Sequence, residues 1–293
     1  MPELPEVEVV RRGLGPHVNG ARIVELEVLN SRSVRQNFGD LAHQLRGAYI
    51  HHVSRRGKYL WFVLDRPEVL VAHLGMSGQF RVRDRRDQKR PTPKHLRIAF
   101  ELEDSNKRNT QLQFIDQRTF GGMYLSPVER LADGESIPRS ITHIARDPLD
   151  PKFDKKRLYE VLSRKQVAIK RVLLDQSVIS GVGNIYADEA LFRTRLHGLV
   201  LASDLGAHSV QSLVSHVTDV MNEALVQGGT SFDALYVNVN GQSGYFSRSL
   251  DAYGRAGEPC TRCGTPIARE KFMNRSSYFC PECQRLPSAV ASG

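Results

Sequence analysis

The sequence predicts an α+β protein with a strand-rich N-terminal half, a helical C-terminal half and a metal site near its end. Apolar residues recur with period two between residues 21 and 125, a pattern typical of antiparallel strands in a sandwich or barrel. From residue 153 onward they recur at helical spacing. The only four cysteines form two close pairs near the C-terminus, which indicates a metal site.

A helix is expected at the start of the N-terminal half. Val7, Val10, Leu14 and Val18 repeat at helical spacing within residues 5–18, so this helix would hold the N-terminus in place. Residues 83–94 are highly charged and are expected to form a solvated loop. Strands are expected at residues 24–28, 59–64, 69–72, 96–100 and 111–115.

Four prolines between residues 126 and 151 interrupt both patterns and predict a linker. Three helices are expected after it, at residues 153–174, 185–196 and 209–226. The predicted domains are a β-sandwich domain at residues 1–130, a linker at 131–152, a helical domain at 153–240 and a cysteine-containing domain at 241–293.

The charge distribution favours a polyanionic partner. The formal net charge is +9, with 24 Lys and Arg against 19 Asp and Glu in residues 1–150 and 17 against 13 in residues 151–293. A nucleic acid between two basic lobes would meet positive potential on both sides, although a generally basic protein has the same composition. No apolar run is long enough to span a membrane and no signal peptide is evident, so a cytoplasmic protein is expected.

The cysteine spacing predicts a structural zinc site. Cys260 and Cys263 are separated by two residues, as are Cys280 and Cys283, with sixteen residues between the pairs. Four thiolates can surround zinc tetrahedrally and leave no open coordination position, so this metal would shape the fold and perform no chemistry. Arg275 would lie near the tip of the connecting hairpin, either exposed to solvent or in contact with a phosphate.

The N-terminus is a candidate nucleophile. Once Met1 is removed, Pro2 carries a secondary amine, and α-amino groups titrate near pH ~8, so part of the population is unprotonated at neutral pH. Such an amine can condense with a sugar carbon to give a cationic iminium, and Glu3 could act as an acid or base beside it. Alternatively, the segment is an ordinary helix start.

Several loops combine glycine with cationic or aromatic residues. The Ser-Gly-Val-Gly-Asn turn at 180–184 could present backbone N–H groups and the Asn184 amide to an anion, or be a simple helix start. Arg118 and Phe120 combine a cation with a large ring, which suits insertion into a duplex. Further loops of this kind are Arg-Arg-Gly-Lys at 55–58 and His-Leu-Gly-Met-Ser-Gly at 73–78.

Taken together and in order, these motifs closely resemble those of the bacterial formamidopyrimidine-DNA glycosylase family. The resemblance covers the N-terminal Pro-Glu, the Arg-Arg-Gly-Lys turn, the His-Leu-Gly-Met-Ser-Gly loop, the Gly-Val-Gly-Asn-Ile-Tyr-Ala-Asp-Glu segment and the cysteine site. It therefore spans nearly the whole chain. It implies an N-terminal β-sandwich, a helix-two-turns-helix domain and a four-cysteine zinc finger. It also implies a monomer bound to double-stranded DNA in the bacterial nucleoid.

The resemblance implies a bifunctional enzyme of base excision repair. Such an enzyme removes 8-oxoguanine and formamidopyrimidines and then cleaves the strand as an AP lyase by β,δ-elimination, with one structural Zn²⁺ and no catalytic cofactor. The implied roles are nucleophile for Pro2, acid or base for Glu3, proton transfer in β-elimination for Lys58, and δ-elimination with phosphate contact for Arg275.

The resemblance also implies a set of DNA contacts. Glu6 is expected in the site, less directly. The backbone contacts are expected to be His95, Arg118, Lys165 and Asn184, and the residues that fill the void left by an extruded base are expected to be Met76, Arg118 and Phe120.

The chain departs from the family pattern in the loop of Arg118, where Gln117 and Thr119 replace residues that are often proline and arginine. Two alternatives stay open. One is an endonuclease VIII-like glycosylase for oxidised pyrimidines, and the other is a non-catalytic zinc-finger DNA-binding protein on the same scaffold. Leu4 and the glycine-containing residues 237–246, which resemble a loop that closes over oxidised guanine, favour the purine branch.

Overall fold

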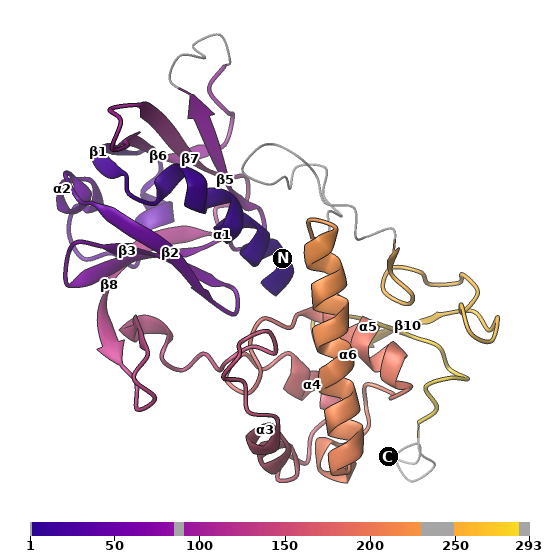
Figure 1. The fold of residues 1–293 in the computed structure, drawn as a ribbon. Coiled ribbons are helices and arrows are strands. Elements are labelled where there is room, and N and C mark those ends of the chain that lie inside the picture. Colours follow the sequence, from indigo (N-terminus) through magenta and orange to yellow (C-terminus); the bar gives the residue numbers. More distant parts are fainter. Residues whose placement is uncertain (1, 85–90, 230–248, 287–293) are drawn as a thin grey trace. The chain divides into compact units, whose positions relative to one another are not determined.

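The computed structural model describes residues 2–84, 91–229 and 249–286 (Figure 1). Residues 2–84 and 91–143 with 228–229 form one compact unit, called the N-terminal unit below. Residues 144–227 with 249–286 form the second, called the C-terminal unit. The domain boundaries predicted after residues 130 and 152 remain predictions, and the one after residue 240 and the expected loop at 237–246 lie outside the described residues.

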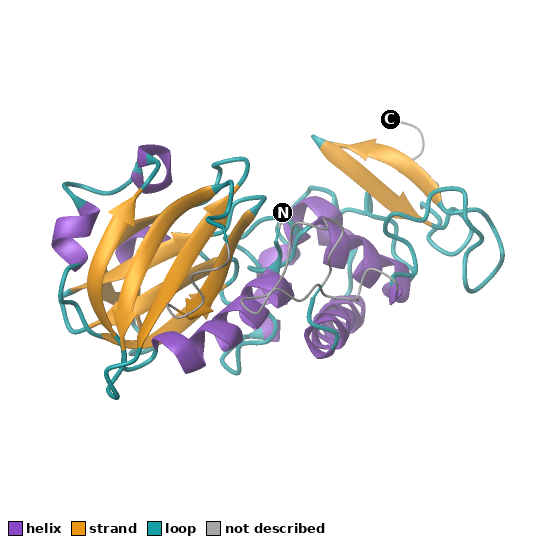
Figure 2. Cartoon of the chain, turned by 90° about the horizontal axis from the view of Figure 1, so that it is seen from above, coloured by secondary structure: helices purple, strands orange, loops and turns teal. Residues whose placement is uncertain are grey.

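The N-terminal unit is an antiparallel β-sandwich, whose strands are orange in Figure 2. Phe62 of one sheet lies 5.9 Å from Phe80 of the other, ring centre to ring centre, and Phe80 lies 5.3 Å from Phe114, so the two sheets share one core. One sheet contains, in spatial order, β2 (Ile50–Arg56), β3 (Tyr59–Leu64), β4 (Glu68–His73), β8 (Gly122–Arg130) and β9 (Ser136–Pro138). The other contains, in spatial order, β1 (Arg22–Val28), β6 (Leu96–Glu103), β7 (Asn109–Asp116) and β5 (Gly78–Asp84).

Helix α1 (Leu4–Val18) completes this core. Val7, Val10, Leu14 and Val18 are at most 1% exposed and belong to the same hydrophobic cluster as the sheets. Burying such side chains stabilises the fold by about 1.5–3 kcal/mol each, so the chain's beginning is firmly attached. The predicted sandwich with an N-terminal helix is confirmed.

Part of the segment that was expected to be a linker belongs to the sheet. β8 extends to Arg130, and β9 pairs with it from Val128 opposite Pro138 to Arg130 opposite Ser136. Pro138 ends the short edge strand, a position that tolerates proline. The short helical segments of this unit are the 3₁₀ helix η1 (Ser31–Val34), α2 (Leu41–Leu45) and the 3₁₀ helix η2 (Arg139–Ile141).

The C-terminal unit contains helices α3 to α6, and the expectation of one helix over 153–174 is wrong. The chain leaves the helix after Leu162 because the backbone between Lys165 and Lys170 bonds instead to the segment 198–203. Within the described ranges no helix combines the length and apolar character that crossing a bilayer requires. The helices are α3 (Lys155–Leu162), α4 (Ile169–Leu173), α5 (Asn184–Thr194), the 3₁₀ helix η3 (Ala202–Asp204) and α6 (Ala207–Val226).

A two-stranded hairpin lies between the cysteine pairs. β10 (Ala268–Phe272) and β11 (Arg275–Phe279) pair in register, with Phe272 opposite Arg275. Met273 in the connecting turn has a positive φ of 54°, which a tight hairpin turn requires. Arg275 therefore lies at the tip of the hairpin, where the sequence predicted it.

Candidate active site

The first turn of α1 fixes the predicted nucleophile and its partner. Pro2 and Glu3 are both buried directly before the helix. The Glu3 N–H donates to Glu6 Oε2 at 2.8 Å, and the Glu3 carbonyl accepts from the Val7 N–H at 3.1 Å. Glu6 thus acts as the reciprocal partner of a helix cap and holds the peptide that carries Pro2.

Glu8 attaches α1 to the strand that precedes Lys58. Its carboxylate is hydrogen-bonded by Arg11 and Arg12 of the same helix and by Arg55 Nε of β2 at 3.1 Å. Burial alone would raise the pKa of Glu8, but the hydrogen bonds from Arg11 and Arg12 and the charge of Arg55 outweigh it and lower the pKa to about 2. An ionised Glu8 therefore fixes the helix relative to the β2–β3 turn.

Lys58 lies in that turn and is 7% exposed, which is unusual for a lysine. Gly57 beside it has a φ of +53°, the left-handed conformation that glycine adopts at little cost. Lys58 is one residue from Tyr59, which pairs with His73 across the strands, and the two rings are 4.9 Å apart. The structure therefore places Lys58, Tyr59 and His73 in one part of the sandwich.

His73, the first residue of the motif at 73–78, is a further candidate. Burial, and then the charge of Lys58, lower its pKa, so the ring is neutral at physiological pH. Its Nδ1 accepts from the Gly75 N–H at 3.1 Å, which leaves Nε2 as the nitrogen that carries the proton. A neutral imidazole donor beside a lysine is suited to bind a phosphate oxygen.

The three residues predicted to fill the void of an extruded base lie on two adjacent loops. Met76 is 43% exposed and Phe120 55% exposed, although both are large apolar side chains. Arg118 is exposed as well, and its Nη1 lies 3.7 Å from Met76 Sδ. His95, predicted to contact the backbone, is joined to the same region because its carbonyl accepts from the Asp116 N–H at 2.9 Å.

In the C-terminal unit, Lys165 and Arg275 line one groove of about 370 Å³ together with Arg171. Asp175 contributes a carboxylate there, and its Oδ2 lies 3.9 Å from Lys165 Nζ. Three cations around one anion leave a positive groove that suits phosphate groups.

Asn184 lies beside the hairpin strand of Arg275. It was expected to offer its amide to an anion, and in the structure Nδ2 donates to the Ser276 carbonyl at 2.8 Å. The start of α5 is therefore bonded to β11, one residue from Arg275.

A buried ion pair reinforces this attachment. Lys170 Nζ lies 2.6 Å from Asp188 Oδ1, with the two side chains 0% and 1% exposed. Lys170 also donates to the Ser276 carbonyl at 3.2 Å, and Asp188 accepts from the Tyr278 N–H at 3.0 Å. Burial raises the pKa of Asp188 to about 6, although the Lys170 charge acts in the opposite direction. Lys170 is therefore a buried cation that supports β11.

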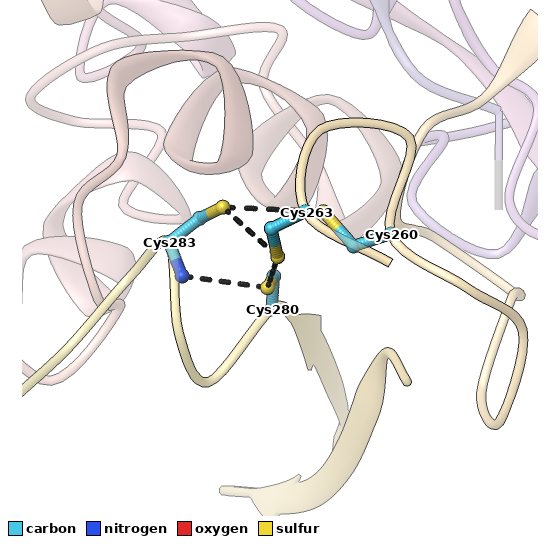
Figure 3. A group of neighbouring side chains, drawn as sticks. All are labelled: Cys260, Cys263, Cys280 and Cys283. Atoms are coloured by element: carbon cyan, nitrogen blue, oxygen red, sulfur yellow. Dashed lines mark hydrogen bonds between the residues drawn. The ribbon is translucent and has the colours of Figure 1, made fainter. Parts of the chain in front are cut away.

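The four predicted cysteines form one cluster (Figure 3). All four Sγ atoms lie within 4.8 Å of one another, and three of the separations are 3.5, 3.6 and 4.0 Å. Tetrahedral zinc with bonds of about 2.3 Å places sulfurs about 3.8 Å apart, so the cluster fits one Zn²⁺. With four protein ligands the metal is structural, and it closes the base of the hairpin that carries Arg275.

Three family models match the chain. The Formamidopyrimidine-DNA glycosylase N-terminal domain matches residues 1–123, and the Formamidopyrimidine-DNA glycosylase H2TH domain matches residues 144–234. The zinc finger found in FPG and IleRS matches residues 257–286. The predicted helix-two-turns-helix domain and four-cysteine finger are thereby confirmed.

Curated relatives and solved structures agree with these matches. Formamidopyrimidine-DNA glycosylases of Rhodococcus jostii and Streptomyces coelicolor are 55% and 56% identical, over 98% of this chain and 97% and 99% of their own. The crystal structure of Lactococcus lactis Fpg with DNA containing an abasic site has a TM-score of 0.82 at 32% identity, covering 97% of this chain and 100% of that one. The chain therefore belongs to the formamidopyrimidine-DNA glycosylase family.

Proposed function

We propose that this protein excises 8-oxoguanine and formamidopyrimidines from duplex DNA in base excision repair, and then cleaves the strand at the abasic site. The main support is that more than half of its residues, over nearly its whole length, are identical to those of relatives named formamidopyrimidine-DNA glycosylase. Structural neighbours include complexes with DNA containing Fapy-dG and carbocyclic 8-oxo-G. The enzyme would act as a monomer and be located with the DNA of the bacterial nucleoid.

The first chemical step uses Pro2. Its unprotonated nitrogen attacks C1′ of the extruded nucleotide, the bond from C1′ to the damaged base breaks, and the base leaves with that electron pair and takes up the proton that the amine nitrogen loses. Glu3 then donates a proton to the ring oxygen as the sugar opens, which leaves a cationic iminium between Pro2 and C1′. The cap that holds Pro2 and Glu3 reduces the ordering needed for this step.

Strand cleavage follows from the electron demand of the iminium. It acidifies C2′, so loss of a proton there expels the 3′ phosphate, and a second elimination expels the 5′ phosphate to leave a one-nucleotide gap. Lys58 transfers a proton in the first elimination, which its buried position in the β2–β3 turn supports. Arg275 binds the phosphate in the second, supported by its place at the hairpin tip in a cationic groove.

The remaining predicted residues bind and deform the duplex. Met76, Arg118 and Phe120 occupy the space of the extruded base, for which their adjacent exposed positions are suitable. His95, Arg118, Lys165 and Asn184 contact the DNA backbone.

Borohydride trapping tests the enzymatic function. The protein is incubated with a duplex that carries 8-oxoguanine opposite cytosine, in the presence of sodium borohydride. We expect a covalent protein–DNA adduct, and without borohydride the strand ends of β,δ-elimination. A protein that binds this duplex yet forms no adduct would be a DNA-binding protein without catalysis.

A lesion panel tests the substrate class. We expect single-turnover excision of 8-oxoguanine to be faster than excision of thymine glycol from the same sequence. The Lactococcus lactis relative has also been crystallised with DNA containing an oxidised pyrimidine, so both rates must be measured rather than binding alone. A faster reaction with thymine glycol would assign the protein to the pyrimidine-directed alternative.

A further inference from the structure

We propose that Asp116 is a positioning residue which, bridged by Ser77, holds the void-filling side chains in place for lesion extrusion. This inference rests on the proposed function, because it concerns the step in which the damaged base leaves the duplex. Asp116 itself is fully buried and does not face the DNA. Its effect is exerted through the loops that carry Met76, Arg118 and Phe120.

The Asp116 carboxylate joins two loops through hydrogen bonds. Oδ1 accepts from Ser77 Oγ at 2.5 Å and from the Arg118 N–H at 3.2 Å, and Oδ2 accepts from the Gly121 N–H at 2.7 Å. Ser77 Oγ in turn accepts from the Arg118 N–H at 3.0 Å. Burial of a carboxylate is unfavourable unless such donors satisfy it. The bonds to the Arg118 and Gly121 N–H groups therefore fix the loop at residues 117–121 at both ends.

The residues between these two anchors carry the exposed side chains. Arg118 and Phe120 flank Thr119, whose φ of +54° lies in the left-handed region that a β-branched residue rarely adopts. This conformation persists only where the surroundings determine it. The bonds from Asp116 to the Arg118 and Gly121 amides supply that constraint.

The loop at residues 74–77, the second loop, is packed backbone to backbone against the loop at residues 117–121, the first loop. A Cβ on Gly75, which has a φ of +61°, would lie 2.5 Å from the Gly121 nitrogen, and a Cβ on Gly121 would lie 2.7 Å from the His73 carbonyl oxygen. Met76 is therefore carried between Gly75, which contacts the first loop, and Ser77, which bonds to Asp116. A displacement of Asp116 would move Met76 and Phe120 together.

Asp116 also fixes a third segment through its backbone. Its N–H donates to the His95 carbonyl at 2.9 Å, and its own carbonyl accepts from Arg97 Nε at 2.7 Å. One buried residue thus links the loops of four predicted DNA contacts. Because Met76, Arg118 and Phe120 would replace the stacking contacts of the extruded base, loosening the loops that carry them should slow extrusion specifically.

The test compares Ser77→Ala with Ser126→Ala, using a lesion in two contexts. Ser126 is also a buried serine of the sandwich, 2% exposed, and lies in β8, where its Oγ bonds to the Pro127 carbonyl. Single-turnover excision of 8-oxoguanine is measured in a fully paired duplex and in an unpaired bubble, where the base needs little unstacking. Stopped-flow fluorescence of 2-aminopurine beside the lesion follows extrusion directly.

We expect Ser77→Ala to lower excision from the paired duplex about tenfold and to slow the 2-aminopurine phase, while excision from the bubble stays within about twofold. Asp116→Asn, which places an amide against the Gly121 N–H, should have the larger effect. Ser126→Ala should change neither rate.

Two results for Ser77→Ala would overturn the inference. One is a paired-duplex rate within about twofold of that of Ser126→Ala, and the other is an equal loss in duplex and bubble. If Asp116→Asn does not fold, Ser77→Ala still decides. An inactive wild-type protein on both substrates would contradict the proposed function, and this inference with it.

Discussion

Each of the two units buries a carboxylate that bonds to a strand of its predicted site. The surroundings shift the pKa of the two carboxyl groups in opposite directions. In the N-terminal unit, Glu8 is surrounded by three arginines, which lower its pKa to about 2. In the C-terminal unit, Asp188 has one cation, Lys170, and Glu189 also lies close to it, so burial prevails and raises its pKa to about 6. The charged form of Glu8 therefore stabilises its unit, whereas ionisation of Asp188 lowers the stability of its unit.

The difference reflects what each carboxylate has to hold. Glu8 joins a helix to a strand that already share a large apolar core. Asp188 and Lys170 bond to a five-residue strand, β11, whose local core consists of few side chains. A hairpin with so little apolar surface needs additional constraints, which zinc and the buried ion pair supply.

Removal of zinc should have the largest effect. We expect Cys260→Ser, or a strong chelator, to unfold the finger and lower affinity for the lesion duplex about a hundredfold or more, because metal binding and folding are coupled in such sites. The single tryptophan, Trp61, is buried in the N-terminal unit, so its fluorescence should not change. Unchanged affinity without metal would contradict the proposed role of the finger.

Lys170→Met should have the next largest effect. It leaves Asp188 buried without its cation, which destabilises by about 3–5 kcal/mol. We expect zinc release, followed with a chromogenic chelator, at a markedly lower urea concentration, with the Trp61 transition unaltered. The double variant Lys170→Met/Asp188→Leu is the control, and it should recover most of the loss if the uncompensated charge is the cause.

Asp188→Asn should change the pH dependence of the C-terminal unit. Because folding raises the pKa of Asp188 from 3.8 to about 6, the unfolded state loses the proton first, and stability falls as pH rises between these values. We expect the stability difference between variant and wild type to change by up to about 3 kcal/mol across this window and to level off above pH 6. Since both proteins carry the same thiolates, protonation of the zinc site cancels. An equal difference at every pH would contradict the raised pKa.

Glu8→Gln should have the smallest effect and the opposite pH trend. Folding lowers the pKa of Glu8 from 4.5 to about 2, so its contribution is complete above pH 4.5 and is lost as pH falls toward 2. We expect a loss of about 1–2 kcal/mol at neutral pH, limited by solvent screening of the partly exposed Arg11 and Arg12. Urea unfolding followed by Trp61 fluorescence measures it, and at pH 2 the variant and wild type should converge. If they differ as much there as at neutral pH, Glu8 is not the titrating group.

The parts of the fold that local pattern determines could be predicted from the sequence. The strand at Tyr59–Leu64 has the predicted bounds, and α1 begins one residue before the predicted start. Contacts between distant segments decided what was missed. The helix expected over 153–174 is divided because its middle bonds to residues 198–203. The end of β5 was missed because Arg83 and Asp84 begin the charged stretch that was expected to form a loop.

The candidate site shows the same division. The zinc ligands and the hairpin position of Arg275 followed from spacing alone. The burial of Lys170 did not, because a lysine in a short cationic segment is usually exposed and its partner Asp188 lies on another helix. The role of Asp116 likewise depends on Ser77, thirty-nine residues away in the chain.

Mapping the trapped adduct tests the central claim, that the amine of Pro2 is the nucleophile. Protein reduced with borohydride on an 8-oxoguanine duplex is digested with nuclease and protease, and the modified peptide is identified by mass spectrometry. We expect the sugar remnant on the nitrogen of Pro2 in protein that has lost Met1, and no adduct in the fraction that retains it, where that nitrogen is an amide. An adduct on Lys58, or full trapping by protein that retains Met1, would contradict the claim.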